Sequence, residues 1–437
     1  MSTLAQVSQA MQSVLTSAAN AVGRTSGFTQ RLSKLSAALF AQIVTFSWWD
    51  NPDASYDELV HYAKVRGLDI TAQALAERFT PAAATCLQSL LSTAVQQVIE
   101  TQPSSLALLK RFVGVVVQDS TVLSLPAALA TLWPGGSNAA HSTVAGLKVQ
   151  LRYSLSDGAL SHLDLQPARM SDQTAPMQSE LLAPGTLRLA DLGYFDLKLM
   201  AREAVQGSYW LTRWKVGVSV CQPRQPALDL ARYLRAQRAA QIDLPIELGR
   251  DERIACRLIA VRVPEHIKAQ RRRRLTHEAK RKAQAVSPAR WALAGWTLLL
   301  SNVPADQLSL SEALVLARLR WQIELLFKTW KDLGHLDQSR SAQPYRILCE
   351  VYAKLLIAVF QHWVILTVVW CIPERSMRQL AQRIRKHVIT LAATLTNPAQ
   401  LVQALTELQR ALTNGARVNK RRASPSAFQL LAQLEAT

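Results

Sequence analysis

FVGVVVQDSTVLSL, residues 112–125, is the segment that decides the fold class. Apolar and β-branched residues occupy both alternating faces of its first half, which is typical of a central strand buried on both sides. Asp119 ends the apolar run and is followed by Ser120 and Thr121. A carboxylate at the end of a buried strand is unfavourable unless it is paired or bound to a metal. The segment therefore predicts a buried sheet that carries a functional acid.

Further strand patterns follow this segment. Residues 144–155 alternate regularly, with four apolar side chains on one face and four polar ones on the other. Residues 160–165 predict an antiparallel partner for them across the turn at residues 156–158. LRLADLGYF, residues 187–195, predicts a short strand that ends at Asp191 and runs into a turn. Successive strands followed by helices predict an α/β sheet domain that begins near residue 110.

Helical periodicity dominates both ends of the chain. Residues 1 to about 105 have apolar residues at helical spacing. Residues 69–91 predict two short helices joined at Thr80-Pro81, which belong either to a plain helical bundle, the interpretation we favour, or to a helix-turn-helix. From Ser309 onward the chain is again helical, and the spacing of Ser309 and Glu312 is that of a capping box.

One apolar stretch, Leu355 to Ile372, is almost long enough to span a bilayer. Gln361 and His362 lie in its middle, and both side chains are unfavourable in lipid. We therefore interpret the stretch as a buried core helix. A membrane-associated protein that uses this stretch together with basic residues is the alternative.

The composition excludes a disordered chain and indicates a polyanionic partner. The 437 residues are 49% hydrophobic, and 50 Lys and Arg against 31 Asp and Glu give a formal charge of +19. Residues 268–290 hold nine Lys or Arg and one acid, Glu278. We interpret this run as a solvated arm that binds phosphate without sequence preference. The five cysteines have no spacing typical of zinc sites or disulfide scaffolds, which favours a reducing cytosol.

ARLRWQIELLFKTWK, residues 317–331, predicts a helix with two distinct faces. An apolar stripe would pack inward and consists of Leu319, Ile323, Leu326 and Trp330. A narrow polar face holds one acid among three cations, namely Arg320, Glu324, Lys328 and Lys331. Ion pairs on an ordinary surface helix also produce such a face. Asp119 and Asp191 favour the functional interpretation, because together with Glu324 they form a set of three hard oxygen ligands that suits Mg²⁺.

This ordered set resembles the DDE transposases of the bacterial insertion-sequence-four family, whose signature is Tyr-x2-Arg-x3-Glu-x6-Lys. Arg320, Glu324 and Lys331 match the spacing. The segments VVVQDSTVLSLP, LADLGYF and LLLSNVP also resemble the family pattern. The tyrosine of the signature falls on Ala317, which removes a phosphate-contacting hydroxyl. The resemblance covers about residues 110–360.

The resemblance implies an α/β fold in which an RNase H-like catalytic domain carries a β-rich insertion and is flanked by N-terminal and C-terminal helical regions. The 133 residues between Asp191 and Glu324 leave room for the insertion. The expected boundaries are 1–108 for an N-terminal helical, possible DNA-end-binding region, 109–206 for the first part of the catalytic domain, 207–305 for the insertion, 306–372 for the second part with the Glu helix, and 373–437 for a basic C-terminal helical region.

The resemblance also implies the chemistry. Asp119, Asp191 and Glu324 are expected to be catalytic and to bind two Mg²⁺ ions, for which Mn²⁺ substitutes. DNA would be nicked, closed into a hairpin intermediate and transferred to a target in cut-and-paste transposition. The expected DNA-binding residues are Arg320, Lys328, Lys331, Arg213 and Trp296. Trp296 either stacks on a flipped-out base or is an ordinary core aromatic, and Arg213 either reaches the DNA end or is a surface strand residue.

The expected partner is double-stranded DNA, both the terminal inverted repeats of the element and the target. A homodimer on DNA is expected because each transposon end needs an active site, and a membrane is not. The implied location is the bacterial cytoplasm, at the nucleoid. The alternative is a catalytically impaired, transposase-derived DNA-binding protein, which Ala317 supports. The three acids argue against it, because DNA binding alone does not require them.

Overall fold

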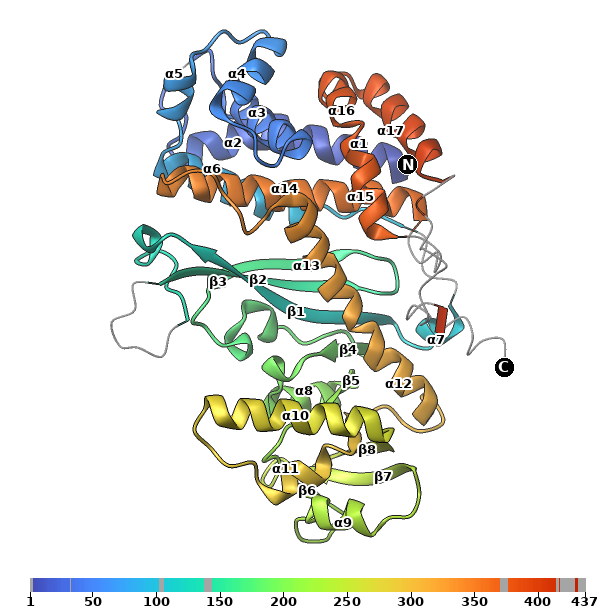
Figure 1. The fold of residues 1–437 in the computed structure, drawn as a ribbon. Helices are drawn as coiled ribbons and strands as arrows, with labels where there is room; N and C mark the ends of the chain where they lie inside the picture. The colour runs from blue at the N-terminus through green and yellow to red at the C-terminus, as the bar shows by residue number, and fades with distance from the viewer. Residues whose placement is uncertain are drawn as a thin grey trace. The chain divides into compact units, whose positions relative to one another are not determined.

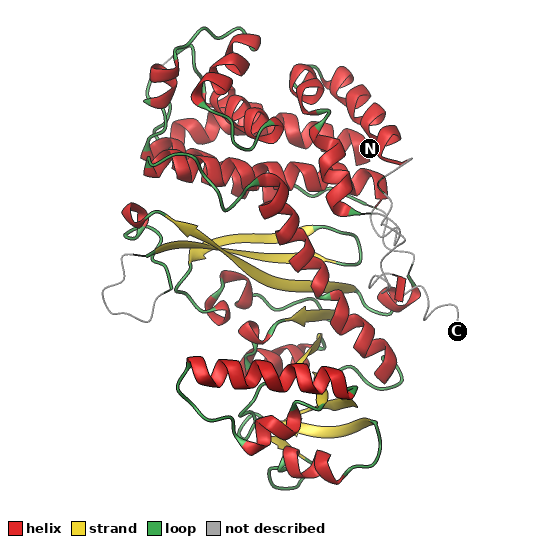
Figure 2. Cartoon of the chain, in the orientation of Figure 1, coloured by secondary structure: helices red, strands yellow, loops and turns green. Residues whose placement is uncertain are grey.

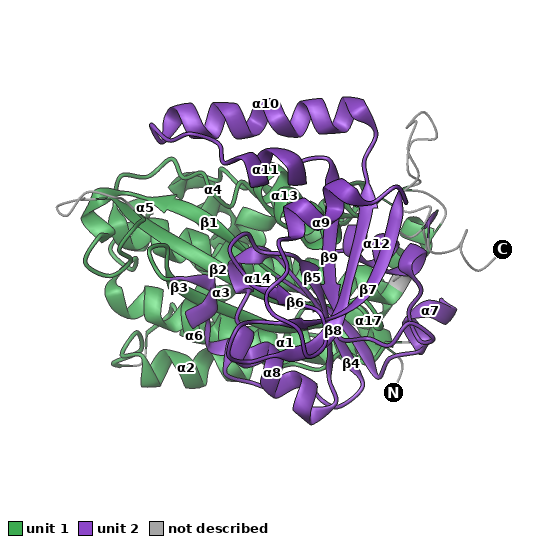
Figure 3. Cartoon of the chain, turned by 90° about the horizontal axis from the view of Figure 1, so that it is seen from below, with its two compact units in different colours: residues 1–105, 119–170, 321–429 green, residues 106–118, 171–320, 430–437 purple. Residues whose placement is uncertain are grey.

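The computed structural model describes residues 3–31, 33–101, 106–136, 144–369, 376–413, 416 and 429–430. The chain forms two compact units (Figure 3). The first comprises residues 1–105, 119–170 and 321–429, and the second comprises residues 106–118, 171–320 and 430–437. The predicted mixed α/β class, with helical segments at both ends of the sequence, is confirmed (Figure 2).

Helices from both ends of the sequence build the first unit (Figure 1). Those from the N-terminal part are α1 (Thr3–Ser13), the π-helix η1 (Val14–Ala18), α2 (Ala19–Thr25), α3 (Ala37–Asp50), α4 (Tyr56–Val65), α5 (Ala72–Ala76) and α6 (Pro81–Val95). Those from the C-terminal part are α13 (Trp321–Gly334), α14 (Pro344–Val369), α15 (Met377–Arg385), α16 (Val388–Thr394) and α17 (Pro398–Thr413). Helix α14 packs on α3 and α6, and α1 packs on α17, so segments distant in sequence share one core.

The two short helices predicted between residues 69 and 91 are α5 and α6. The side chain of Thr80 accepts a hydrogen bond from the Ala83 N–H, and Pro81 occupies the first turn, so the local sequence defines where α6 begins. Helix α6 packs against α2 and α14. This packing is that of a helical bundle, the interpretation we favoured.

Helix α14 contains the apolar stretch that raised the question of a membrane span. It is the one helix among the described residues that is long and apolar enough to cross a membrane, but 94% of its most apolar window is buried inside the protein. The imidazole of His362 is 1% exposed, and its Nε2 lies 2.6 Å from the Gly158 carbonyl oxygen. Burial lowers the pKa of His362 to about 4, so the ring is neutral at pH 7. The buried-helix prediction is confirmed up to Thr367, and residues 370–372 lie outside the described residues.

The first unit also contains three strands in the order β3-β2-β1. They are β2 (Ala145–Ser154), β3 (Leu160–Pro167) and the last residues of β1 (Gly114–Leu125), with the 3-10 turn η2 (Ala127–Leu129) after β1. Strands β2 and β3 pair antiparallel as predicted, and Gly158 in their turn has a φ of +82°. Both faces of β2 are buried, including Lys148, whose Nζ donates to the Met170 carbonyl at 2.7 Å. The alternation of apolar and polar residues therefore shows which side chains share a face of β2, but the polar face is not exposed to solvent.

The second unit has the remaining strands in the order β1-β4-β5-β9-β8-β7-β6. The first three are parallel, and the later neighbours are antiparallel. The strands are β4 (Thr186–Ala190), β5 (Tyr209–Arg213), β6 (Val220–Cys221), β7 (Gln241–Leu248), β8 (Ile254–Arg262) and β9 (Trp296–Ser301). The helices are α7 (Ala107–Lys110), η3 (Asp172–Thr174), η4 (Pro176–Gln178), η5 (Leu192–Tyr194), α8 (Leu197–Gln206), α9 (Leu230–Ala236), α10 (Glu265–Arg281), α11 (Pro288–Leu293) and α12 (Leu310–Leu319). The region predicted to be rich in strands, 207–305, contains β5 to β9.

The basic run of residues 268–290, predicted to be a solvated arm, forms most of helix α10 up to Arg281 and the beginning of α11 from Pro288. The prediction of solvent exposure holds, because no residue of α10 is buried. A helix with so little apolar surface is stabilised by its contacts at a few positions, which are described below.

The predicted helix of residues 317–331 is divided in the structure. Helix α12 begins with the predicted capping box of Ser309 and Glu312 and ends at Leu319, and α13 begins at Trp321. Arg320, between them, keeps helical dihedral angles of −50° and −32°. The apolar stripe is buried as predicted, at Leu319, Ile323, Leu326 and Trp330. The predicted single helix is therefore two helices that meet at Arg320, with Glu324, Lys328 and Lys331 on the second.

Candidate active site

The two predicted aspartates follow the end of one parallel ladder. Strands β1 and β4 pair from Gly114 with Thr186 to Gln118 with Ala190. Asp119 and Asp191 are the residues that come directly after this last pair, and both are partly exposed. The prediction that Asp119 ends its strand was wrong, because β1 continues to Leu125. What ends there is its pairing with β4, so the carboxylate still stands at a transition in the sheet.

Short-range contacts hold the backbone around each aspartate. The Ser120 N–H donates to Oδ1 of Asp119 at 2.8 Å. Asp191 precedes η5, and the Tyr194 N–H donates to its carbonyl oxygen at 3.0 Å. A Cβ atom at Gly193 would lie 2.6 Å from Oδ2 of Asp172, so a larger residue in this turn would require the Asp172 side chain to shift. The LADLGYF segment thus forms a compact turn that presents Asp191.

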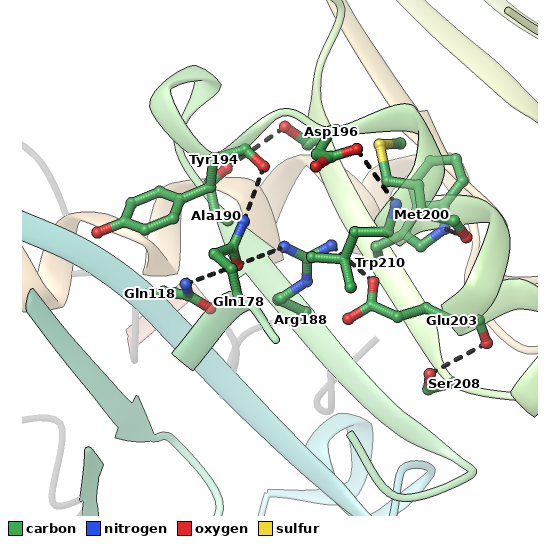
Figure 4. A network of polar contacts seen from close by, with 12 residues as sticks. Gln118, Gln178, Arg188, Ala190, Tyr194, Asp196, Met200, Glu203, Ser208 and Trp210 are labelled. Carbon is green, nitrogen blue, oxygen red and sulfur yellow. Dashed lines mark hydrogen bonds and ion pairs between the residues drawn. The ribbon is translucent and has the colours of Figure 1, made fainter. Parts of the chain in front are cut away.

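A buried polar network lies beneath this turn (Figure 4). Arg188 of β4 and Glu203 of α8 form an ion pair at 2.6 Å, and their side chains are 4% and 1% exposed. The amide of Gln178 accepts a hydrogen bond from Nε2 of Gln118 at 2.9 Å and donates one to the Tyr194 carbonyl at 3.3 Å. A small pocket nearby is lined by Asp191 together with Arg188 and Tyr194, among other residues.

Sequence reasoning missed this network. Arg188 interrupts an apolar strand and Glu203 lies on the inward side of α8, but neither pattern names its partner. The available signal was Arg188, a charged residue within an otherwise apolar strand, because a charge that is buried requires a partner of opposite charge. The partner itself is set by the packing of α8 against β5 and β8.

Glu324 lies on the first turn of α13 and is partly exposed. Lys328, one turn later, is exposed. Lys331 donates from Nζ to the Val122 carbonyl of β1 at 3.1 Å, so α13 is joined to the strand that carries Asp119. Within the first unit, Asp119 and Glu324 are therefore carried by two elements in direct contact.

Oxygen donors of the predicted kind are present, but a metal centre is not defined by the structure. No group of three or more His, Cys, Asp or Glu side chains within the described part of the chain is placed to hold a metal ion. Asp119 and Glu324 belong to the first unit and Asp191 to the second. Three carboxylates nevertheless match the preference of Mg²⁺ for hard oxygen ligands, so the donor chemistry fits the ion.

Arg213 and Trp296 occupy contrasting environments in the second unit. Arg213, the last residue of β5, is exposed. Trp296, the first residue of β9, is 8% exposed and belongs to a hydrophobic cluster, and the guanidinium of Arg262 lies 4.7 Å from its ring centroid. This placement matches the alternative of a core aromatic, and stacking on an extruded base stays a prediction. The exposed tryptophan of this region is Trp291 of α11, at 39%.

Comparison with known proteins places these observations in a family. The chain is 25% identical over 433 residues to the transposase for insertion sequence element IS231F of Bacillus thuringiensis subsp. israelensis, covering 92% of this chain and 90% of the relative. It is 28% identical over 359 residues to the IS231B transposase of Bacillus thuringiensis subsp. berliner, covering 76% and 74%. It is 22% identical over 388 residues to the IS1151 transposase of Clostridium perfringens, covering 83% and 81%.

The family described as "Transposase DDE domain" matches residues 112–360, which include Asp119, Asp191 and Glu324. The match covers more than half of the chain and begins at the strand-forming segment from which the fold class was predicted. The chain therefore belongs to the DDE transposase family and is a transposase.

Proposed function

We propose that this transposase cuts and joins DNA at the ends of its own insertion sequence, with Asp119, Asp191 and Glu324 as its catalytic and metal-binding residues. The observation that carries the proposal is the placement of the aspartates directly after the last β1–β4 pair, with the Glu324 helix joined to β1 through Lys331. The narrower assignment to the insertion-sequence-four family rests on Arg320, Glu324 and Lys331 and stays part of the proposal.

The proposed reaction has two kinds of step. In cleavage, the oxygen of water bonds to phosphorus, the bond to the 3′ oxygen breaks, and a 3′-hydroxyl is released. In transfer, that 3′-hydroxyl attacks a phosphodiester of the opposite strand, which forms a DNA hairpin and releases the flanking strand with its own 3′-hydroxyl. Water then opens the hairpin and regenerates the 3′-hydroxyl of the element, which attacks a phosphodiester of the target and displaces a target 3′-oxygen. Two Mg²⁺ ions, or Mn²⁺, would activate the attacking oxygen and stabilise the leaving oxygen. The three carboxylates provide the negative charge and the oxygen ligands that this requires.

Cations around Glu324 are proposed to hold the DNA. Arg320, Lys328 and Lys331 would bind phosphates beside the scissile bond, and Arg213 would reach the DNA end. Lys331 uses one of its three ammonium donors on Val122, which leaves two for a phosphate. Trp296 would stack on a base only if the Arg262 guanidinium, which lies over its ring, changed its position.

Partners and organisation follow from this chemistry. We propose a homodimer on DNA, with one active site for each terminal inverted repeat, acting at the nucleoid in the bacterial cytoplasm. Residues 109–206 and 306–372 would form the catalytic domain around the 207–305 insertion. Residues 1–108 and 373–437 would be helical flanking regions, of which 1–108 binds the DNA ends.

A second candidate function, a DNA-binding protein without catalysis, is favoured by one observation. Ala317, at the position of the signature tyrosine, lies in α12 and is partly buried, so the phosphate-contacting hydroxyl of the signature is absent at that point of the helix. Cleavage of DNA separates the two candidates, because only the first requires the three acids.

The test is cleavage of a plasmid that carries the flanking terminal repeats, with Mg²⁺ and with a chelator. We expect wild type to release the element only with Mg²⁺, and Asp119→Ala to leave the plasmid uncut while binding it. Asp306→Ala is a matched control, because Asp306 also accepts its successor's N–H and is exposed. Equal cleavage by wild type and Asp119→Ala would show that the catalytic assignment is wrong. Binding without cleavage by every variant would favour the second candidate.

A further inference from the structure

Helix α10 presents two different faces. Its sequence, EHIKAQRRRRLTHEAKR, contains seven Lys or Arg and two Glu, and none of its residues is buried. The inward face is defined by Arg271 and Arg272. The outer face of α10 is defined by four exposed cations, Arg273, Arg274, Lys280 and Arg281. At 100° per residue these four lie within an arc of roughly 120°, opposite the inward pair.

The inward arginines hold α10 to its own unit. Arg271 donates to the Trp296 carbonyl at 2.7 Å and to the Thr297 hydroxyl at 3.0 Å. Nε of Arg272 donates to the Trp291 carbonyl at 3.3 Å, and its guanidinium lies 4.8 Å from the centroid of the Trp291 ring. Four consecutive arginines thus divide into two that anchor the helix and two that face solvent.

Like charges meet on this surface. Burial and the positive charge of Arg213 lower the pKa of Arg271. The exposed end of β5 therefore brings its arginine close enough to repel α10. Arg271 lies on the inward face, so this charge adds to the positive potential of α10 as a whole, while the four exposed cations of the outer face are the ones that an anion can reach.

We propose that the outer face of α10 binds the phosphate backbone of duplex DNA without regard to sequence. From Arg273 to Arg281 the helix rises about 12 Å, which corresponds to about four phosphates of one strand at roughly 3.4 Å of duplex axis each. Exposed, long cations reach phosphates without selecting bases. The inference rests on the proposed function for its partner, DNA, but it requires no catalysis.

Binding measured without catalysis tests this proposal. Full-length protein carrying Asp119→Asn is titrated with labelled duplexes in metal-free buffer over a range of salt concentrations. One duplex has the terminal repeat and one has unrelated sequence. Arg273→Glu/Arg274→Glu is expected to weaken both duplexes at least tenfold and to reduce the slope of log affinity against log salt by about 2. The neutral variant Arg273→Gln/Arg274→Gln should show the same direction with a smaller effect.

The matched control reverses two charges on α8, which lies at the opposite edge of the second unit from α10 (Figure 3). Lys198 and Arg202 are exposed there, and Lys198→Glu/Arg202→Glu should bind as the parent does. An unchanged salt slope in the α10 variant, or an equal loss in the α8 variant, would overturn the proposal. A loss confined to the terminal-repeat duplex would overturn sequence independence. Tighter binding to anionic vesicles through the same residues would assign the surface to a membrane instead.

A separate observation, the hydrogen bonding of Gln178, carries a second inference. Its side chain is 7% exposed and bonds to three segments of the second unit (Figure 4). Gln118 immediately precedes Asp119, and its amide donates to Gln178. Tyr194, whose carbonyl accepts from Gln178, donates its own N–H to the Asp191 carbonyl. One buried amide is therefore linked to the side chain that precedes Asp119 and to the backbone of the turn that follows Asp191.

We infer that Gln178 is a positioning residue for the metal-binding aspartates. It touches neither substrate nor the proposed ions, and it acts by fixing the β1 and η5 backbones. The ion pair of Arg188 and Glu203 supports it, since Arg188 lies 3.5 Å from the same Gln178 oxygen. Residues that orient metal ligands typically change metal affinity 10- to 100-fold when they are replaced. This inference also rests on the proposed function.

Metal binding, rather than activity, tests the role of Gln178. Mn²⁺ binding to the full chain is followed by the electron paramagnetic resonance of the free ion, for Gln178→Leu, Asp191→Asn and Ser301→Ala. Ser301 is a matched control, because its buried hydroxyl bonds to the Trp210 carbonyl in the same sheet. We expect a tenfold or greater loss of Mn²⁺ affinity for Gln178→Leu and no change for Ser301→Ala, with both folded.

The possible outcomes separate the two ideas. Equal Mn²⁺ affinity of Gln178→Leu and wild type, with a loss only in Asp191→Asn, would refute the positioning role and keep the metal site. Equal affinity for wild type and Asp191→Asn would refute the metal site itself. Gln178→Glu keeps the oxygen that accepts from Gln118 and loses the N–H that donates to Tyr194. We therefore expect a Mn²⁺ affinity between those of wild type and Gln178→Leu. A Mn²⁺ affinity as low as that of Gln178→Leu would contradict the role of the bond to Gln118.

Discussion

Replacing Glu324 by glutamine is expected to lower the rate of DNA cleavage on the order of a thousandfold, while DNA binding stays within a few fold of wild type. The amide has nearly the same shape as the carboxylate but lacks its charge, so it binds a divalent ion far less well. Stabilisation of the transition state by a bound ion contributes several kcal/mol, and each 1.36 kcal/mol corresponds to about a factor of ten in rate. Single-turnover cleavage of a terminal-repeat duplex measures the effect.

Glu407→Gln is the control for this substitution. Glu407 is an exposed glutamate of the same unit that accepts a hydrogen bond from Gln403 within α17, so the chemical change is identical. Its cleavage rate should remain within about twofold of wild type, as surface substitutions usually have little effect. A Glu324→Gln enzyme that cleaves like the control would exclude Glu324 from catalysis. Equal loss of binding and cleavage would instead indicate a structural role.

The second large effect concerns stability. Arg188→Met is expected to lower the free energy of unfolding by about 3–5 kcal/mol, because it leaves Glu203 as an unpaired charge that is 1% exposed. Glu203→Leu should lower the free energy of unfolding by a similar amount, since it leaves the buried Arg188 without its counter-charge. The double variant should recover much of the loss, because it removes both charges and replaces them with apolar groups of similar size. Urea denaturation of the full chain measures these changes.

An exposed pair in the same unit provides the comparison. Arg253 and Glu247 form an ion pair with side chains 37% and 22% exposed. Arg253→Met should change the free energy of unfolding by less than about 1 kcal/mol, as solvent already screens this pair. If Arg188→Met were no more harmful than Arg253→Met, the buried network would not be the stabilising element beneath Asp191. A double variant as unstable as the sum of the singles would show that the two charges do not interact.

Local patterns determined much of the fold and the identity of the candidate acids. The apolar run before Asp119 predicted a buried strand, and LRLADLGYF predicted a strand followed by a turn. The capping box at Ser309 placed the start of α12. These features depend on neighbours within a few residues, so the sequence contains them directly.

Tertiary structure alone decided the surroundings of those residues. The break at Arg320, the division of the arginines into inward and outer faces of α10, and the burial of both faces of β2 are not visible in local periodicity. The partners of Arg188 and Gln178 come from other elements. Periodicity shows which side chains share a face, whereas burial and pairing depend on what packs against that face. The sequence therefore determined which residues carry charge and where their strands and helices begin, and the packing decided which of those charges are anchored, paired or exposed to solvent.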